Sequence, residues 1–177
     1  SACFYAKQSG LQWPRHLRKL IFLGTPHAGA PLERGGNYVN VMLDASPYTT
    51  AFARLAKVRS AGITDLRYGS LLDGDWASKD RFAARAKAKP HAVPLPDGVK
   101  CYAIAATTAA KGDIGTGKTP KGDNLVPVAS ALGQSADPAR CLAIPKSRQW
   151  LGYNMNHMEL LNRKDVHERL SKWLADK

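Results

Sequence analysis

The sequence has 177 residues and a mass of 19.2 kDa, with 44% hydrophobic and 23% charged residues. This size and composition favour one globular domain and exclude a disordered chain or a collagen-like repeat. The 26 Lys and Arg against 14 Asp and Glu give a formal net charge of +12, which can indicate nucleic acid, anionic lipid or acidic substrates as partners. No stretch approaches the roughly 20 apolar residues of a membrane-spanning helix.

Two strands are expected in the first two thirds of the chain. Residues 1–8 look like the end of a helix, and the apolar run LRKLIFL at 17–23 predicts a buried strand that ends at Gly24-Thr25-Pro26. Helical patterns follow near 38–43 and 49–58. The run VKCYAIAA at 99–106 then predicts a second strand.

The last third predicts one more strand and a closing helix. The run RCLAI at 140–144, flanked by Pro138 and Pro145, indicates the third strand. A helix over about 165–175 has a capping-box-like start at Asp165 and Glu168, with an apolar stripe of Val166, Leu170, Trp173 and Leu174. Strands separated by helices or loops predict an α/β fold with a small parallel sheet and flanking helices.

Basic residues and cysteines carry no specific site. The loose basic clusters within 79–89 and 111–121 carry no nucleic-acid motif, so we expect a solvated basic surface and no nucleic-acid partner. Cys3, Cys101 and Cys141 have neither metal-type nor CxxC spacing. They are interpreted as buried small apolar residues in a reducing compartment. The opening SACFYAKQSG lacks the blocks of a signal peptide, so we expect a cytoplasmic protein.

The segment 112–119 matches the phosphate-loop pattern GxxxxGK[ST]. A phosphate loop needs a helix directly after it, with its N-terminus facing the anion. Here Pro120 and Gly122 follow at once and cannot propagate a helix. A Gly- and Lys-rich surface loop explains the segment better, and phosphate or nucleotide binding at 112–119 is kept as an alternative.

Asp123 and His157 are the candidate catalytic pair. Asp123 follows the second expected strand and His157 the third. The carboxyl ends of parallel strands meet at one edge of the sheet, so the two side chains can meet there. The carboxylate would hold the imidazole tautomer while the other ring nitrogen takes a proton from a nucleophile. A metal site of His157, Glu159 and His167 is a rival, but its spacing fits no helical ligand pair, and we expect no metal and no cofactor.

Three motifs together resemble the C-terminal half of an α/β-hydrolase. They are LGTPHAGAP after the first strand, GDNLVPVASALG after the second, and NHMELL before the last helix. The resemblance is to bacterial lipases and esterases similar to GPI-inositol-deacylase-like lipases. It implies that residues 1–177 form the C-terminal part of one α/β-hydrolase domain with a cap insertion at 34–97. It also implies Asp123 as triad acid, His157 as triad base, and a substrate-binding loop with Gly24, Thr25, Pro26 and His27.

The resembled family places its serine in a GxSxG elbow, which these residues lack. If the resemblance holds, the nucleophile lies upstream of residue 1, and this chain is truncated. Ser1, Ser130, Ser135 and Cys3 are not favoured as substitutes.

The expected function is therefore that of a serine esterase or lipase cleaving carboxylic esters of small-molecule or lipid-like substrates, with this chain alone inactive. An exposed edge of the first strand predicts either a missing, more acidic N-terminal half or self-association. The alternative is a non-catalytic hydrolase-like binding module.

Overall fold

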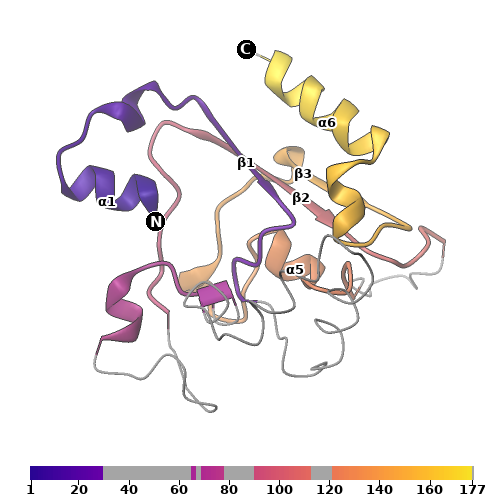
Figure 1. The fold of residues 1–177 in the computed structure, drawn as a ribbon, viewed down its shortest axis with the longest axis horizontal. Coiled ribbons are helices and arrows are strands. Elements are labelled where there is room, and N and C mark those ends of the chain that lie inside the picture. The colour runs from indigo at the N-terminus through magenta and orange to yellow at the C-terminus, as the bar shows by residue number, and fades with distance from the viewer. Residues whose placement is uncertain (30–64, 67–68, 78–89, 113–120, 177) are drawn as a thin grey trace, which may run out of the picture.

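The computed structural model describes residues 1–29, 65–66, 69–77, 90–112 and 121–176. Within these residues the chain forms a three-stranded parallel sheet with flanking helices, which confirms the α/β class (Figure 1). The helices expected at 38–43 and 49–58, and most of the cap expected at 34–97, lie outside the described residues.

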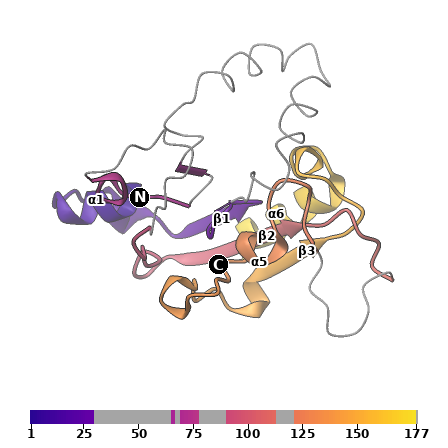
Figure 2. The ribbon, with the colours of Figure 1, turned by 90° about the horizontal axis from the view of Figure 1, so that it is seen from below.

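The elements follow one another along the chain as α1 (Ala2–Gln8), a 3₁₀ helix (Trp13–His16), β1 (Lys19–Leu23), a 3₁₀ helix (Asp73–Trp76), β2 (Lys100–Ala106), α5 (Val128–Ala131), two 3₁₀ helices (Pro138–Arg140 and Lys146–Arg148), β3 (Gln149–Gly152), a 3₁₀ helix (Met158–Leu161) and α6 (Lys164–Ala175). In Figure 1, α1 lies at the left and α6 at the upper right; in Figure 2, α1 is again at the left and the C-terminal end lies near the centre of the view.

The strand order is β1-β2-β3, so β2 is central. Six of its seven residues are buried, as its run of small and apolar side chains predicts. The expectation of a buried first strand is wrong in degree, because every residue of β1 is only half-buried. Within the described chain β1 pairs with β2 alone, which leaves its other side open.

The third strand is not where the sequence predicted it. Residues 140–144 form the end of a 3₁₀ helix and an irregular segment, and the sheet is completed by Gln149–Gly152 instead. Ile144 and Leu142 pack beneath the sheet against Cys101 and Ala103. The apolar run is therefore explained by packing against a sheet face, because burial alone does not distinguish a strand from a core loop.

Side chains of β2 alternate between the two faces of the sheet. Tyr102, Ile104 and Ala106 face α6, whereas Ala105 faces α5 and Ala103 faces Ile144. This alternation is the period of two expected of a strand. It places helices on both faces of the sheet and exposes its carboxyl edge to the loops that carry the candidate site.

The C-terminal helix is confirmed, but two details of its prediction are wrong. Val166 and Trp173 are buried and Leu170 packs beside them, whereas Leu174 is 64% exposed. No side chain caps the helix start; Asp165 instead forms an ion pair of 2.8 Å with Arg163. At the other end, Lys19 Nζ donates hydrogen bonds to the carbonyls of Trp173, Leu174 and Asp176, which neutralises the negative end of the helix dipole.

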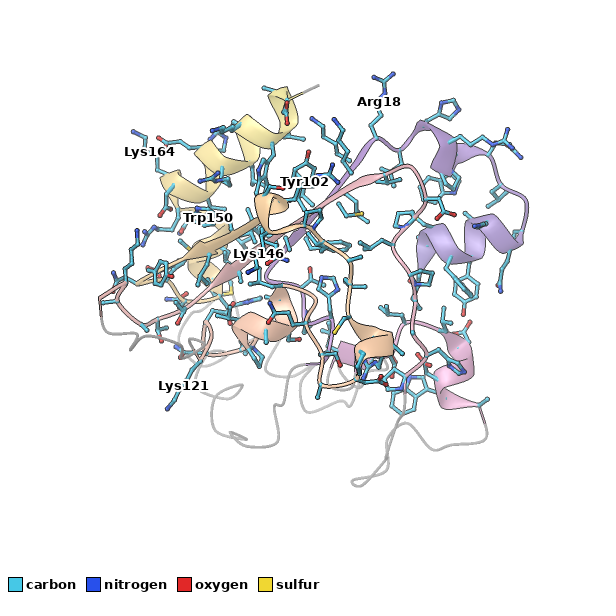
Figure 3. The ribbon with its side chains drawn as sticks, turned by 180° about the vertical axis from the view of Figure 1, so that it is seen from behind. Arg18, Tyr102, Lys121, Lys146, Trp150 and Lys164 are labelled. Carbon is cyan, nitrogen blue, oxygen red and sulfur yellow. The ribbon has the colours of Figure 1, made fainter. Side chains whose placement is uncertain are left out.

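The surface features agree only partly with the sequence. All three cysteines are free; Cys101 is buried as expected and burial raises the pKa of its thiol, but Cys141 is exposed. Figure 3 shows Arg18, Lys121 and Lys164 projecting from separate parts of the chain. No helix in the described part of the chain combines the length and apolar composition needed to cross a bilayer.

Candidate functional site

Asp123 and His157 meet beyond the carboxyl ends of β2 and β3. His157 Nδ1 lies 2.8 Å from Asp123 Oδ2, and the backbone N–H of His157 donates to the Asp123 carbonyl at 3.1 Å. The Asp123 side chain is fully buried, whereas 27% of the His157 side chain is exposed. Because a carboxylate can only accept, Nδ1 donates this bond and Nε2 is left as the basic nitrogen.

A tight turn fixes the carboxylate. Leu125 N–H and Val126 N–H donate to Asp123 Oδ1 at 3.0 and 2.7 Å, so each carboxylate oxygen has a separate task. Gly122 has a φ of 137°, and a Cβ there would lie 2.3 Å from the Val126 carbonyl oxygen. Only glycine fits this close approach. The sequence GDN thus encodes a turn that was not identified from the sequence.

His157 is carried by a capped 3₁₀ turn. Asn156 Oδ1 accepts from the N–H groups of Met158 and Glu159, and Glu159 Oε2 accepts from Asn156 N–H at 2.7 Å. This reciprocal arrangement is a capping box, and its N-x-x-E spacing is a signal that the sequence reasoning missed. Met155 and Leu160, buried on either side, anchor the turn in the core.

The loop after β1 comes close to this pair. Gly24 is buried, and its N–H donates to the Ile104 carbonyl at 2.9 Å, which continues the β1–β2 pairing. Ser130 on α5 fixes the far end of the loop, since its hydroxyl donates to the Gly29 carbonyl and accepts from Ala28 N–H, both at 3.0 Å. With both of these bonds made, Ser130 serves as a structural clamp.

His27 is the perturbed titratable group of this loop. Burial lowers the pKa of its imidazole to about 4. The ring packs edge-on against Phe22 at a centroid distance of 4.5 Å. Its buried Nε2 has no hydrogen-bond partner among the described residues. His27 is therefore neutral at pH 7 and acts as part of an apolar wall.

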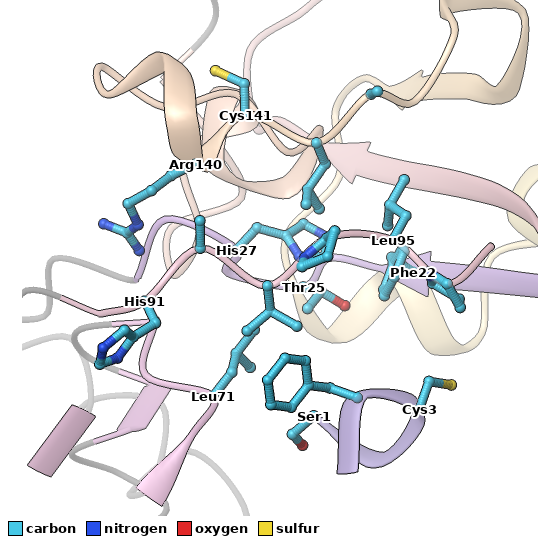
Figure 4. A pocket seen from close by; sticks show the side chains of 18 of the residues that line it. Ser1, Cys3, Phe22, Thr25, His27, Leu71, His91, Leu95, Arg140 and Cys141 are labelled. Atoms are coloured by element: carbon cyan, nitrogen blue, oxygen red, sulfur yellow. The ribbon is translucent and has the colours of Figure 1, made fainter. Parts of the chain in front are cut away.

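A pocket of about 670 Å³ opens beside the loop (Figure 4). Of the four residues expected to bind substrate, Thr25 and His27 line this pocket, whereas Gly24 and Pro26 are not among its described lining residues. Its other walls are mainly apolar and include Phe4, Leu20, Phe22, Leu71, Val93 and Leu142. The volume is within the range typical of small-molecule sites.

A second Asp–His pair borders the same pocket and was not anticipated. Asp75 is fully buried, and its Oδ1 lies 2.6 Å from Nδ1 of His91, a pocket-lining residue that is largely exposed. Burial opposes ionisation of Asp75, but hydrogen bonds from His91, Leu72 and Leu71 outweigh it and lower the pKa of the carboxyl. These bonds tie residues 71–75 to residue 91 and so hold one wall of the pocket.

Among the residues that the structure describes, the remaining sequence candidates do not join the site. In the described part of the chain no group of three His, Cys, Asp or Glu residues could hold a metal ion, and Glu159 is occupied in the capping box. Residues 113–120 of the phosphate-loop pattern lie outside the described residues. Ser1 and Cys3 line the pocket, and the Ser135 hydroxyl accepts from Asp137 N–H. None of these side chains forms a described hydrogen bond with His157.

No family model, curated protein or solved structure matches this chain. The chemistry of the site therefore follows from its geometry. The buried Asp123 carboxylate orients the partly exposed His157 imidazole, whose other nitrogen can accept a proton. Such a pair can act as a general base toward a hydroxyl or thiol.

Proposed function

We propose that this chain provides the acid and base of a serine hydrolase that cleaves carboxylic esters. The observation that carries the proposal is the bond of 2.8 Å between fully buried Asp123 and partly exposed His157. It is supported by the placement of both residues beyond the carboxyl ends of neighbouring parallel strands. The resemblance of the three sequence motifs to an α/β-hydrolase points the same way.

In the proposed mechanism His157 Nε2 removes the proton from a serine hydroxyl as that oxygen attacks the ester carbonyl. The Asp123 carboxylate stabilises the imidazolium that forms and keeps the ring in position. His157 then returns the proton to the leaving alcohol, and a water molecule repeats the sequence on the acyl-enzyme. The apolar pocket that includes Thr25 and His27, but neither Asp123 nor His157, among its described lining residues would receive the apolar part of the ester.

The serine is proposed to lie upstream of Ser1, on a segment that adds to the open side of β1. Lys100 N–H donates to the Arg18 carbonyl, and Gly24 N–H donates to the Ile104 carbonyl. Because backbone bonds to one neighbour come from alternate residues, Lys19, Ile21 and Leu23 direct their backbone groups to the open side. A parallel strand there would satisfy these groups and place its own carboxyl end beside Gly24. Self-association along β1 is the competing use of this edge.

The test combines a fluorophosphonate probe with intact-mass spectrometry of the full-length protein. We expect one serine outside residues 1–177 to be labelled, and His157→Ala to abolish labelling and lower kcat on a p-nitrophenyl ester by at least about 10⁴-fold. His167→Ala, which alters an exposed histidine on α6, is the matched control and should change neither.

Three results would contradict the proposal. Labelling that survives His157→Ala would show that His157 is not the base. A label within residues 1–177 would place the nucleophile elsewhere. If the full-length protein is neither labelled nor able to hydrolyse the ester, but still binds that ester, it is a binding module instead.

A further inference from the structure

Gly24 lies against the imidazole ring of His157. A Cβ built on Gly24 would be 2.9 Å from His157 Cε1, 3.2 Å from His157 Nδ1 and 2.7 Å from Leu160 Cδ1. The first and last of these distances are shorter than real carbon contacts allow. The backbone of Gly24 thus lies close to Cε1 and Nδ1 of the ring, and Nδ1 is the atom that meets Asp123.

Neither partner in this contact can easily move away. Gly24 is held by its hydrogen bond to the Ile104 carbonyl on the central strand. On the other side, Leu160 is 3% exposed within the main core, and the turn that carries His157 is fixed by its capping box. A side chain at position 24 would therefore have to displace the imidazole, the Leu160 methyl group, or both.

We propose that Gly24 is a positioning residue for His157: its lack of a side chain allows the strand end to pack against the imidazole and keep Nδ1 on Asp123. This inference assigns Gly24 a role distinct from substrate binding. Its catalytic consequence rests on the proposed function, whereas the position of the ring can be measured without any activity.

The test is Gly24→Ala, with Gly98→Ala as the matched control. Gly24 and Gly98 both have positive φ values, of 59° and 74°, so alanine is strained at either position. A Cβ at Gly98, however, meets nothing within 4 Å. The difference between the two variants therefore isolates the contact with His157 from the backbone strain.

The first readout is the low-field proton resonance of His157 Nδ1–H in the full-length protein. We expect this resonance to be lost or shifted in Gly24→Ala and kept in Gly98→Ala. We also expect kcat for ester hydrolysis to fall by about 100-fold in Gly24→Ala with little change in KM, since a misplaced catalytic group loses about this factor. The control should retain kcat.

A wild-type measurement covers the case in which Gly24→Ala does not fold. The geometry requires a strong nuclear Overhauser effect between a Gly24 Hα and His157 Hε1, and its absence would overturn the proposal. An unchanged His157 resonance in Gly24→Ala, or the same loss in both variants, would also overturn it. If the wild-type protein hydrolyses no ester, the proposed function fails, while the two resonance measurements still decide the role of Gly24.

Discussion

Burial of the His27 imidazole makes the stability of this protein depend on pH in mildly acidic solution. Burial lowers its pKa from 6.5 to about 4 in the folded chain. Between these values the unfolded chain binds a proton that the folded chain does not, so the free energy of unfolding falls as pH falls. The interval from 6.5 to about 4 corresponds to a loss of roughly 3 kcal/mol. The dependence fades out about one pH unit above 6.5, where the unfolded chain also leaves this group unprotonated.

The perturbation that removes this dependence is His27→Phe. Phenylalanine cannot be protonated, and it can keep the edge-on contact with Phe22. We expect urea titrations between about pH 4.5 and 7.5 to show a shallower pH dependence in the variant, with most of the roughly 3 kcal/mol difference developed at the acid end. Acidic groups with lowered pKa, such as Asp75 and Asp165, act equally in both proteins and cancel in the comparison.

The control is His16→Gln, which alters an exposed histidine and should leave the wild-type pH dependence unchanged. Identical pH dependence in wild-type protein and His27→Phe would refute the reasoning, because it would mean that the folded protein protonates His27 as readily as the unfolded chain does.

Two further substitutions test how the site and the core are held. Asn156→Ala removes the cap of the turn that carries His157 and should lower the free energy of unfolding by about 1 kcal/mol, measured by urea unfolding. Asn162→Ala, at the end of the same turn, is the control, and an equal loss in both variants would contradict the role of the cap. Trp173→Ala deletes a 5% exposed side chain packed 4.9 Å from the Tyr102 ring and should cost about 3–5 kcal/mol. Leu174→Ala, at a 64% exposed neighbour, should cost less than about 0.5 kcal/mol, and equal losses in thermal unfolding would contradict this assignment of the core.

The sequence predicts those helices and strands in which a long stretch of apolar residues is buried. The run VKCYAIAA predicted a strand, and β2 forms there with six of its seven residues buried. The polar-flanked QWLG of β3 gave no comparable signal, because Trp150 and Leu151 are only half-buried. The strand predicted at residues 140–144 was wrong, because an apolar segment packed against the face of a sheet has the same composition as a strand within it.

The candidate site was predictable at the level of topology but not of contacts. Parallel strands predict that residues following β2 and β3 share an edge, which brought Asp123 and His157 together as candidates. The approach of Gly24 to His157 joins segments about 130 residues apart, and no local pattern encodes it. The turn at Gly122 is local, since a Cβ there would meet Val126, but it depends on a close backbone approach that the letters GDN did not reveal. The Asp75–His91 pair was missed because its residues are 16 positions apart and join a 3₁₀ helix to a loop, a contact that no local pattern encodes.

The bonds from Lys19 to the end of α6 bear on how the protein folds during synthesis. Lys19 and Trp173 are 154 residues apart, so β1 and α6 can meet only after the residues between them have left the ribosome. Contacts of such separation slow folding, since the intervening chain must be ordered before they form. Until then Ile21 and Leu23, which pack in the same core as α6, stay uncovered and are open to non-native apolar contacts.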